Sequence, residues 1–265
     1  MRKEIDIEEE GWTSAVLDAI QEDRIHVAVQ GIHLAADTDC MLYGECLARL
    51  VTEKNDVVNA GEFIPSLELL RKTPVLDQHM IKLILDELEA DQRAVLGCNI
   101  STDSLANKSS WNLIYNQLVA RSHLAHRLIL EIIETHAFGN VFTANEFLSS
   151  ARQLGCLIAI DDFGRGQVTP WQLLKIKVDI IKIDGGFVRE IKENISGGNS
   201  LHFLIGFAKC VAPTVVVEGV ETRTHHIDAM MAGATHTQGY YLSRPTLLNP
   251  MKSNYRENYD TTRGV

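Results

Sequence analysis

The sequence lacks the features that mark several large classes of protein. No apolar run approaches the roughly 18 residues of a membrane span, and the acidic N-terminal segment does not suit a signal peptide. Basic residues are too few for a nucleic-acid-binding surface, with 25 Lys and Arg against 35 Asp and Glu and a formal net charge of −10. We therefore expect a cytoplasmic protein that binds neither a membrane nor a nucleic-acid polymer. A small phosphorylated ligand, held through metal ions, remains open.

Motifs of the common zinc and nucleotide sites are also missing. The five cysteines have no CxxC spacing and lie mostly in apolar segments, so we interpret them as buried free thiols. The ten histidines have no HxxxH spacing, and there is no GxGxxG motif and no P-loop. The tripeptide Asp162-Phe163-Gly164 occurs without the lysine strand and catalytic loop of a kinase.

Short β-branched or apolar runs alternate with longer amphipathic segments from about residue 26 to residue 245, which is typical of βα units and a parallel sheet. The predicted strands number eight, as a closed barrel requires, and one barrel domain commonly has about 250 residues. Only residues 31–40 separate the first two strands, which predicts a hairpin and hence one antiparallel strand. The predicted strands are 25–30, 41–50, 94–100, 127–133, 156–161, 178–184, 214–218 and 235–238, and the predicted helices are 76–88, 111–120, 144–154, 201–211 and 222–231.

Polar residues stand where the predicted buried strands end. Any one of them could simply mark a strand that meets water, but five consecutive strands carry one, and such ends converge on the mouth of a barrel. Buried carboxylates need counter-charge, and several acidic oxygens favour Mg²⁺, Mn²⁺ or Ca²⁺ over zinc. These residues are Asn99, Glu131, Asp161 with Asp162, Lys182 with Asp184, Glu218 and Gln238, and Glu45 lies inside a further apolar run.

The alternation of side chains along a strand sorts these residues further. Asp161 and Asp162 cannot both face inward on a regular strand, so Asp162 is predicted to begin the loop, where the pair could bridge two metal ions. Lys182 and Asp184 share a face. The lysine either holds a water in the same cavity or forms an ion pair with Asp184 or Asp161.

Eight short motifs, in order, resemble those of the EAL domain, the bacterial phosphodiesterase that hydrolyses cyclic di-GMP. The resemblance covers residues 13–247, between an N-terminal extension (1–12) and a polar C-terminal tail (248–265) that we expect to be partly disordered. It implies an α/β fold, a modified (β/α)8 TIM-like barrel with one antiparallel strand, two Mg²⁺ or Mn²⁺ ions, linear pGpG as product and a homodimer. The motifs are Glu45-Cys46-Leu47-Ala48-Arg49, Glu62-Phe63-Ile64-Pro65, Asn99-Ile100-Ser101, Glu131-Ile132-Ile133-Glu134, Asp161-Asp162-Phe163-Gly164, Lys182-Ile183-Asp184, Glu218-Gly219-Val220-Glu221 and Gln238-Gly239-Tyr240.

The resemblance also implies roles for individual residues. Lys182 positions the attacking water beside Gln238, Glu134 braces the loop after the aspartate pair, and either Glu218 or Lys182 assists proton transfer. Gln30 and Arg49 contact the ligand, unless they are a strand-end amide and a surface arginine. Glu221 either binds a guanine edge or caps the helix that begins at Thr222. The implied metal ligands are Glu45, Asn99, Glu131 and Asp161 for one ion and Asp161, Asp162 and Glu218 for the other.

The sequence departs from the family pattern at three places. Cys46 replaces the usual alanine and Gly31 the usual proline, and the loop that usually reads TGYSSL spans Arg165 to Pro170 with a different sequence. Loss of that loop's form is associated in the family with weak catalysis. Two functions therefore stay open, a cyclic di-GMP phosphodiesterase and a catalytically weak receptor or protein-interaction module. An enolase-type lyase on the same barrel fails on the ordered motifs.

Overall fold

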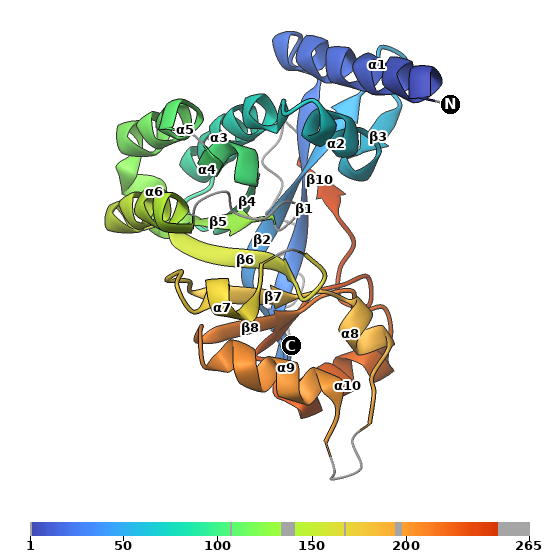
Figure 1. Cartoon of the computed structure of the whole chain (residues 1–265), viewed down its shortest axis with the longest axis vertical. Coiled ribbons are helices and arrows are strands. Elements are labelled where there is room, and N and C mark those ends of the chain that lie inside the picture. Colours follow the sequence, from blue (N-terminus) through green and yellow to red (C-terminus); the bar gives the residue numbers. More distant parts are fainter. Residues whose placement is uncertain (1, 107, 134–140, 167, 194–197, 249–265) are drawn as a thin grey trace, which may run out of the picture.

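The β-branched runs of the sequence form the strands of a closed barrel (Figure 1). The computed structural model describes residues 2–248 except 107, 134–140, 167 and 194–197. In this part of the chain the strands are β1 (Ile25–Leu34), β2 (Asp37–Val51), β3 (Val57–Asn59), β4 (Leu96–Ile100), β5 (Leu128–Ile132), β6 (Leu157–Phe163), β7 (Ile180–Ile183), β8 (Thr214–Val217), β9 (His236–Thr237) and β10 (Thr246–Leu247).

Amphipathic segments form the helices outside the barrel. Apolar residues at helical spacing bury one face of each, as do Leu76, Met80, Ile84 and Leu88 in the helix from Thr73 to Ala90. The helices described are α1 (Arg2–Gln21), α2 (Ala60–Leu69), α3 (Thr73–Ala90), α4 (Thr102–Ala106), α5 (Lys108–Ala120), η1 (Ser122–Arg127, a 3₁₀ helix), α6 (Val141–Leu154), α7 (Pro170–Leu173), α8 (Gly186–Arg189), α9 (Ser200–Lys209) and α10 (Arg223–Ala232).

The ring of strands runs β1, β2, β4, β5, β6, β7, β8, β9 and back to β1. β1 is antiparallel to both of its ring neighbours, whereas all other neighbours in the ring are parallel. The predicted TIM-like barrel with one antiparallel strand is therefore confirmed. Outside the ring, β3 extends β2 and β10 pairs with β1.

The N-terminal helix α1 and the helices α9 and α10 lie at opposite ends of the view in Figure 1. α1 and α2 pack together beside β1 and β3, while α9 and α10 cover the other end. α1 runs through the predicted boundary after residue 12 and buries Val16 and Ala19 in the core. Residues 249–265 of the predicted tail lie outside the described part of the chain. No described helix has the length and hydropathy needed to span a bilayer.

Side chains that point into the barrel form two layers. One layer is an apolar cluster of Ile32, Tyr43, Ile129, Ala159, Ile180 and Val216, separate from the larger core between strands and helices. Because side chains alternate along a strand, the residue two positions nearer the mouth of the barrel on each of these strands also points inward. Those positions hold the polar residues that the sequence places at the strand ends.

Candidate active site

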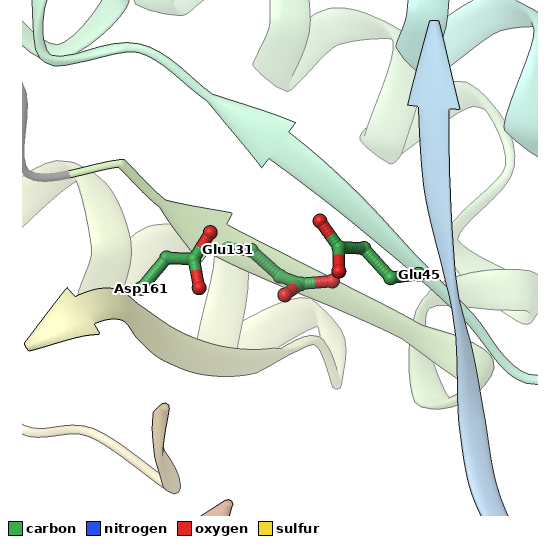
Figure 2. A group of neighbouring side chains, drawn as sticks. All are labelled: Glu45, Glu131 and Asp161. Atoms are coloured by element: carbon green, nitrogen blue, oxygen red, sulfur yellow. The ribbon is translucent and has the colours of Figure 1, made fainter. Parts of the chain in front are cut away.

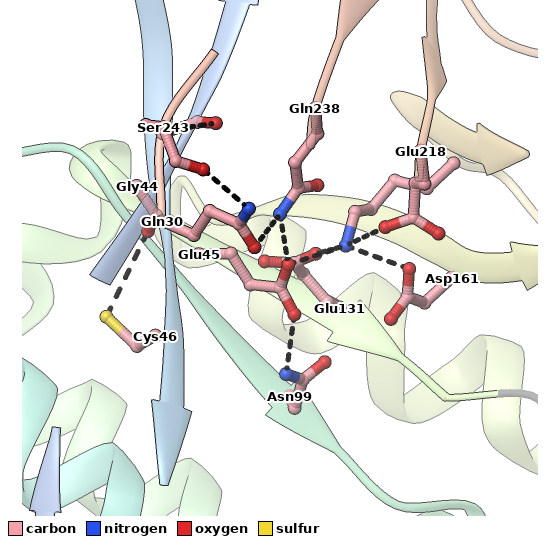
Figure 3. A network of polar contacts seen from close by, with 12 residues as sticks. Gln30, Gly44, Glu45, Cys46, Asn99, Glu131, Asp161, Glu218, Gln238 and Ser243 are labelled. Atoms are coloured by element: carbon pink, nitrogen blue, oxygen red, sulfur yellow. Dashed lines mark hydrogen bonds and ion pairs between the residues drawn. The ribbon is translucent and has the colours of Figure 1, made fainter. Parts of the chain in front are cut away.

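Each strand of the ring delivers a polar side chain to the same mouth of the barrel. Glu131 lies two residues beyond Ile129, Lys182 two beyond Ile180, and Gln30 two before Ile32 because β1 runs the other way. Figure 3 shows these side chains converging. The inward ring, as we call it, consists of Gln30, Glu45, Asn99, Glu131, Asp161, Lys182, Glu218 and Gln238.

Lys182 is fully buried and lies among the four carboxylates of this inward ring. Its Nζ lies 2.7 Å from Glu131 Oε2, 2.8 Å from Asp161 Oδ1, 2.9 Å from Glu218 Oε1 and 3.1 Å from Glu45 Oε2. Gln238 Nε2 donates to Glu45 Oε2 at 2.6 Å, and Asn99 Nδ2 donates to Glu45 Oε1 at 3.1 Å. Lys182 thus pairs with Asp161, as one sequence interpretation allowed, and with three further carboxylates.

The charges of the inward ring do not balance. Among the described side chains, one ammonium group faces four carboxylates that are largely removed from water. Burial raises the pKa of Glu131 to about 8, although Lys182 opposes the shift, and burial together with Asp161 raises the pKa of Glu218 well above its usual range. Additional cations would relieve this excess of negative charge.

Hydrogen bonding separates Glu45 from the other carboxylates of the ring. Burial alone would raise its pKa, but Lys182 and the amides of Gln238 and Asn99 outweigh burial, so its pKa is lowered. The pKa of Lys182 is raised despite its burial, because the surrounding carboxylates outweigh desolvation. Glu45 and Lys182 therefore form a charged pair at the centre of the site.

The oxygen atoms of the ring fit a hard divalent cation. One carboxylate oxygen from each of Glu45, Glu131 and Asp161 lies within 4.8 Å of the other two, and the three carboxylates face one another (Figure 2). Three buried oxygens of the ring, Asn99 Oδ1, Glu131 Oε1 and Gln238 Oε1, have no hydrogen-bond or ion-pair partner among the described residues. Carboxylate and amide oxygens are the donors that Mg²⁺ and Mn²⁺ prefer.

A family model described as the EAL domain matches residues 13–245. The chain belongs to the EAL domain family. Two curated relatives from Escherichia coli (strain K12) are cyclic di-GMP phosphodiesterase PdeF, 29% identical over 210 residues, and probable cyclic di-GMP phosphodiesterase PdeA, 30% identical over 208 residues. Each alignment covers 77% of this chain and 28% of the relative. This EAL domain thus spans less than a third of those proteins.

Solved structures share the fold of this EAL domain. The FimX EAL domain from Pseudomonas aeruginosa bound to c-di-GMP superposes with a TM-score of 0.77 at 24% identity, covering 89% of this chain and 96% of that one. An EAL domain protein from Listeria monocytogenes EGD-e superposes with a TM-score of 0.76 at 22% identity, covering 92% and 97%.

Asp162 is the point at which the structure of this EAL domain corrects our prediction. We predicted that it begins the loop, but β6 continues through Asp162 to Phe163. The pairing of β6 with β7 slips between Ile160 and Phe163, and Asp162 has a φ of 52°, so a β-bulge with a left-handed residue interrupts the alternation that we assumed. Burial and the adjacent Asp161 raise the pKa of Asp162 to about 6.

Two other predicted residues, Arg49 and Glu221, do not join the inward ring. Arg49 is half-buried on β2, and its Nη1 donates to the carbonyl of Ala48 at 2.9 Å. Glu221 is exposed, 4.0 Å from Arg189, and the side chain that caps α10 is Thr222, so the capping alternative for Glu221 is wrong. Glu134 lies outside the described residues.

Sequence reasoning missed the support of Gln30. Gln30 Nε2 donates to the carbonyl of Ser243 at 2.9 Å, and this hydrogen bond links the segment between β9 and β10 to β1. The ring of His33 occupies the space beside Gly31, and its Nε2 lies 2.5 Å from where a Cβ of Gly31 would be, so a larger residue there would require His33 to move. The period-2 pattern of β1 could have indicated that Gln30 points inward, but no sequence signal indicates Ser243.

Proposed function

We propose that this EAL domain hydrolyses cyclic di-GMP to linear pGpG with the help of two Mg²⁺ or Mn²⁺ ions. The observation that carries the proposal is the inward ring, in which four converging carboxylates face one lysine. The relatives named as cyclic di-GMP phosphodiesterases support the choice of substrate.

The ligands of the two ions would come from five residues of the inward ring and from Asp162. Glu45, Asn99, Glu131 and Asp161 would hold one ion, and Asp161, Asp162 and Glu218 the other. The chemistry that the bound ions supply is a lower pKa of water and shielding of the charge that develops on the phosphate.

The remaining polar residues orient the water and the substrate. Lys182 is the group that holds the attacking water, and Gln238, which donates to the same oxygen of Glu45 as Lys182, keeps that carboxylate in place. Glu218 lies 2.9 Å from Lys182 Nζ, so its carboxylate can accept the proton of a water that the ammonium group of Lys182 holds. Gln30, Arg49 and Glu221 would contact the nucleotide, and Glu134 would brace the loop after the aspartate pair.

The decisive experiment is incubation of the purified protein with cyclic di-GMP and Mg²⁺ or Mn²⁺, followed by chromatography for pGpG. We expect turnover that stops with excess EDTA and is suppressed by Ca²⁺, whose longer bonds and looser coordination would misplace the water. Full turnover in excess EDTA would contradict the proposal.

Charge-removing variants complete this experiment. Glu45→Gln and Asp161→Asn should each lower turnover more than about a hundredfold while the barrel stays folded, because they remove metal-binding charge and no core volume. Asp161→Asn should be the more damaging, since Asp161 is proposed to contact both ions. Near-native rates with either variant would show that the ring is not the active site.

The second candidate function is a catalytically weak receptor for cyclic di-GMP that uses the same pocket. The altered loop favours this weak receptor. The guanidinium group of Arg165 lies 3.8 Å from the carboxylate of Asp184, and the backbone N–H of Arg165 donates to the carbonyl of Asp162. Binding of cyclic di-GMP without release of pGpG, at saturating Mg²⁺ and Mn²⁺, would identify this function.

We further propose a homodimer, which sedimentation analysis would detect as twice the chain mass.

A further inference from the structure

Tyr43 closes the barrel directly beneath the inward ring. It precedes Glu45 by two residues on β2, so both side chains point into the barrel, and Tyr43 is only 1% exposed. Its ring packs in the apolar cluster with Ile32, Ile129 and Ile180. Among the described members of that cluster, Tyr43 is the one with a polar side-chain atom.

Gly97 provides the space in which Tyr43 meets Glu131. A Cβ at Gly97 would lie 1.9 Å from Glu131 Oε1 and 2.7 Å from Tyr43 Cε2. Both side chains therefore fill the volume that a larger residue on β4 would occupy. The phenol and the carboxylate are neighbours across this glycine.

The two neighbours carry complementary atoms without partners. The hydroxyl of Tyr43 and Oε1 of Glu131 are both buried and make no hydrogen bond with any described group. A buried hydroxyl without a hydrogen-bond partner destabilises the fold. Glu45 offers a poorer acceptor, because Asn99 already donates to its Oε1 and Gln238 and Lys182 to its Oε2.

We propose that Tyr43 is a positioning residue for Glu131: its hydroxyl donates to Glu131 Oε1 when the site holds metal and leaves Oε2 to face the ions. The inference rests on the proposed metal-dependent function and adds a support beneath the ligands. Groups that hydrogen-bond a ligating carboxylate fix its orientation, and their loss typically weakens metal binding about 10–100-fold.

The test compares Tyr43→Phe with the wild type by calorimetric titration with Mn²⁺ and by thermal unfolding in EDTA. We expect the dissociation constant for Mn²⁺ to rise about tenfold, because only the hydroxyl is lost. The unfolding temperature without metal should stay the same or rise, since the substitution removes an unpartnered buried hydroxyl. If Tyr43 only supported the fold, Tyr43→Phe would lower the unfolding temperature and leave the dissociation constant for Mn²⁺ unchanged. Tyr115→Phe is the matched control, because Tyr115 on α5 packs against Trp111 and should leave both quantities unchanged.

The outcomes separate this inference from the proposed function. An Mn²⁺ affinity of Tyr43→Phe within twofold of the wild type, or a lower unfolding temperature with unchanged affinity, would overturn the role of Tyr43 and leave the metal site intact. A wild type that binds no Mn²⁺ would overturn both proposals. Gly97→Ala gives a second measure, since a Cβ there collides with Glu131 Oε1, and we expect it to weaken Mn²⁺ binding at least as much as Tyr43→Phe.

Discussion

One buried ammonium group organises the acidic mouth of the barrel. Lys182 contacts four carboxylates that come from β2, β5, β6 and the end of β8. Removing one partner of a buried ion pair leaves uncompensated charge, which is more costly than the intact pair is stabilising. Without metal, Lys182 is therefore the main electrostatic tie between strands on opposite sides of the ring.

We expect Lys182→Met to lose roughly 3–5 kcal/mol of unfolding free energy in EDTA at neutral pH, because the carboxylates then repel one another without compensation. Saturating Mn²⁺ should restore much of that loss. Urea denaturation with and without Mn²⁺ measures both effects, and Lys209→Met, at the exposed end of α9, is the control. An equal loss in EDTA and in Mn²⁺ would mean that packing, and not charge, explains the effect.

Most of the inward ring could be predicted from the sequence because polar residues follow β-branched runs. Glu218 follows four β-branched residues and Asp161 follows an apolar run, so both could be recognised from the sequence as strand-end residues. Tyr43 was not, because a tyrosine in an apolar run looks like ordinary core. The backbone of Asp162 could not be predicted either, since a bulge depends on pairing with β7.

At the scale of elements, α3 holds the loop that follows β4. The buried Asp77 Oδ2 accepts hydrogen bonds from Ser101 N at 2.9 Å, Ser101 Oγ at 2.6 Å and Ser104 Oγ at 2.7 Å. Burial nevertheless raises the pKa of Asp77 to about 6. This carboxylate fastens the segment directly after Asn99 to the helix layer.

The raised pKa of Asp77 predicts a pH-dependent stability. The folded protein binds this proton more tightly than the unfolded chain, so the stabilisation is complete below the unfolded pKa and is lost as the pH rises through about 6. Asp77→Asn should remove roughly 1 kcal/mol of the difference in unfolding free energy between about pH 5 and about pH 7. Urea denaturation at both pH values tests this, with Asp86→Asn on the exposed face of α3 as control. The same pH dependence in wild type and Asp77→Asn would refute the assignment.

The altered loop after β6 leads into α7 through a helix cap. Thr169 accepts a hydrogen bond from Gln172 N at 3.2 Å, and Pro170 occupies the first turn, where its missing N–H costs nothing. Pro170 therefore starts a helix. Val168 is buried.

Grafting TGYSSL over residues 165–170 should raise turnover severalfold at saturating cyclic di-GMP, because Asp162 would be better held for the second ion. Arg165→Thr alone is the smaller matched change, and it removes the contact with Asp184. Unfolding curves of both variants control for the loss of buried Val168 in the graft. No gain in rate, with unchanged metal affinity, would mean that the loop sequence does not limit catalysis.

The helices from α3 onward that have a clear apolar face and the β-branched strands of the ring were predicted well, whereas α1 and the short or proline-containing elements were not. α3 and α6 show clear apolar spacing, whereas α2 contains Pro65 and offers little periodicity. β3 and β10 have three and two residues, too few for an alternation pattern. Their formation depends on partners distant in sequence, which local patterns do not encode.

At the scale of the whole molecule, metal binding should stabilise the entire barrel. The proposed ligands come from strands around the ring, so global unfolding disperses them and binding adds to global stability. Mn²⁺ at about 100 times its dissociation constant should add roughly 2.7 kcal/mol. Thermal unfolding in Mn²⁺ and in EDTA measures this, and Glu131→Gln should respond less. An unfolding temperature that does not change with Mn²⁺ would exclude binding at the ring.

Closure of the ring by β1 has a consequence for how the protein is made. β1 must pair with β9, about 200 residues later in the chain, before Gln30 and Gln238 can meet. A chain emerging from the ribosome therefore exposes the acidic residues of this domain to water until β9 has been made, and the site forms only when the ring closes. The order of synthesis thus postpones the burial of four carboxylates until Lys182 and β9 are present.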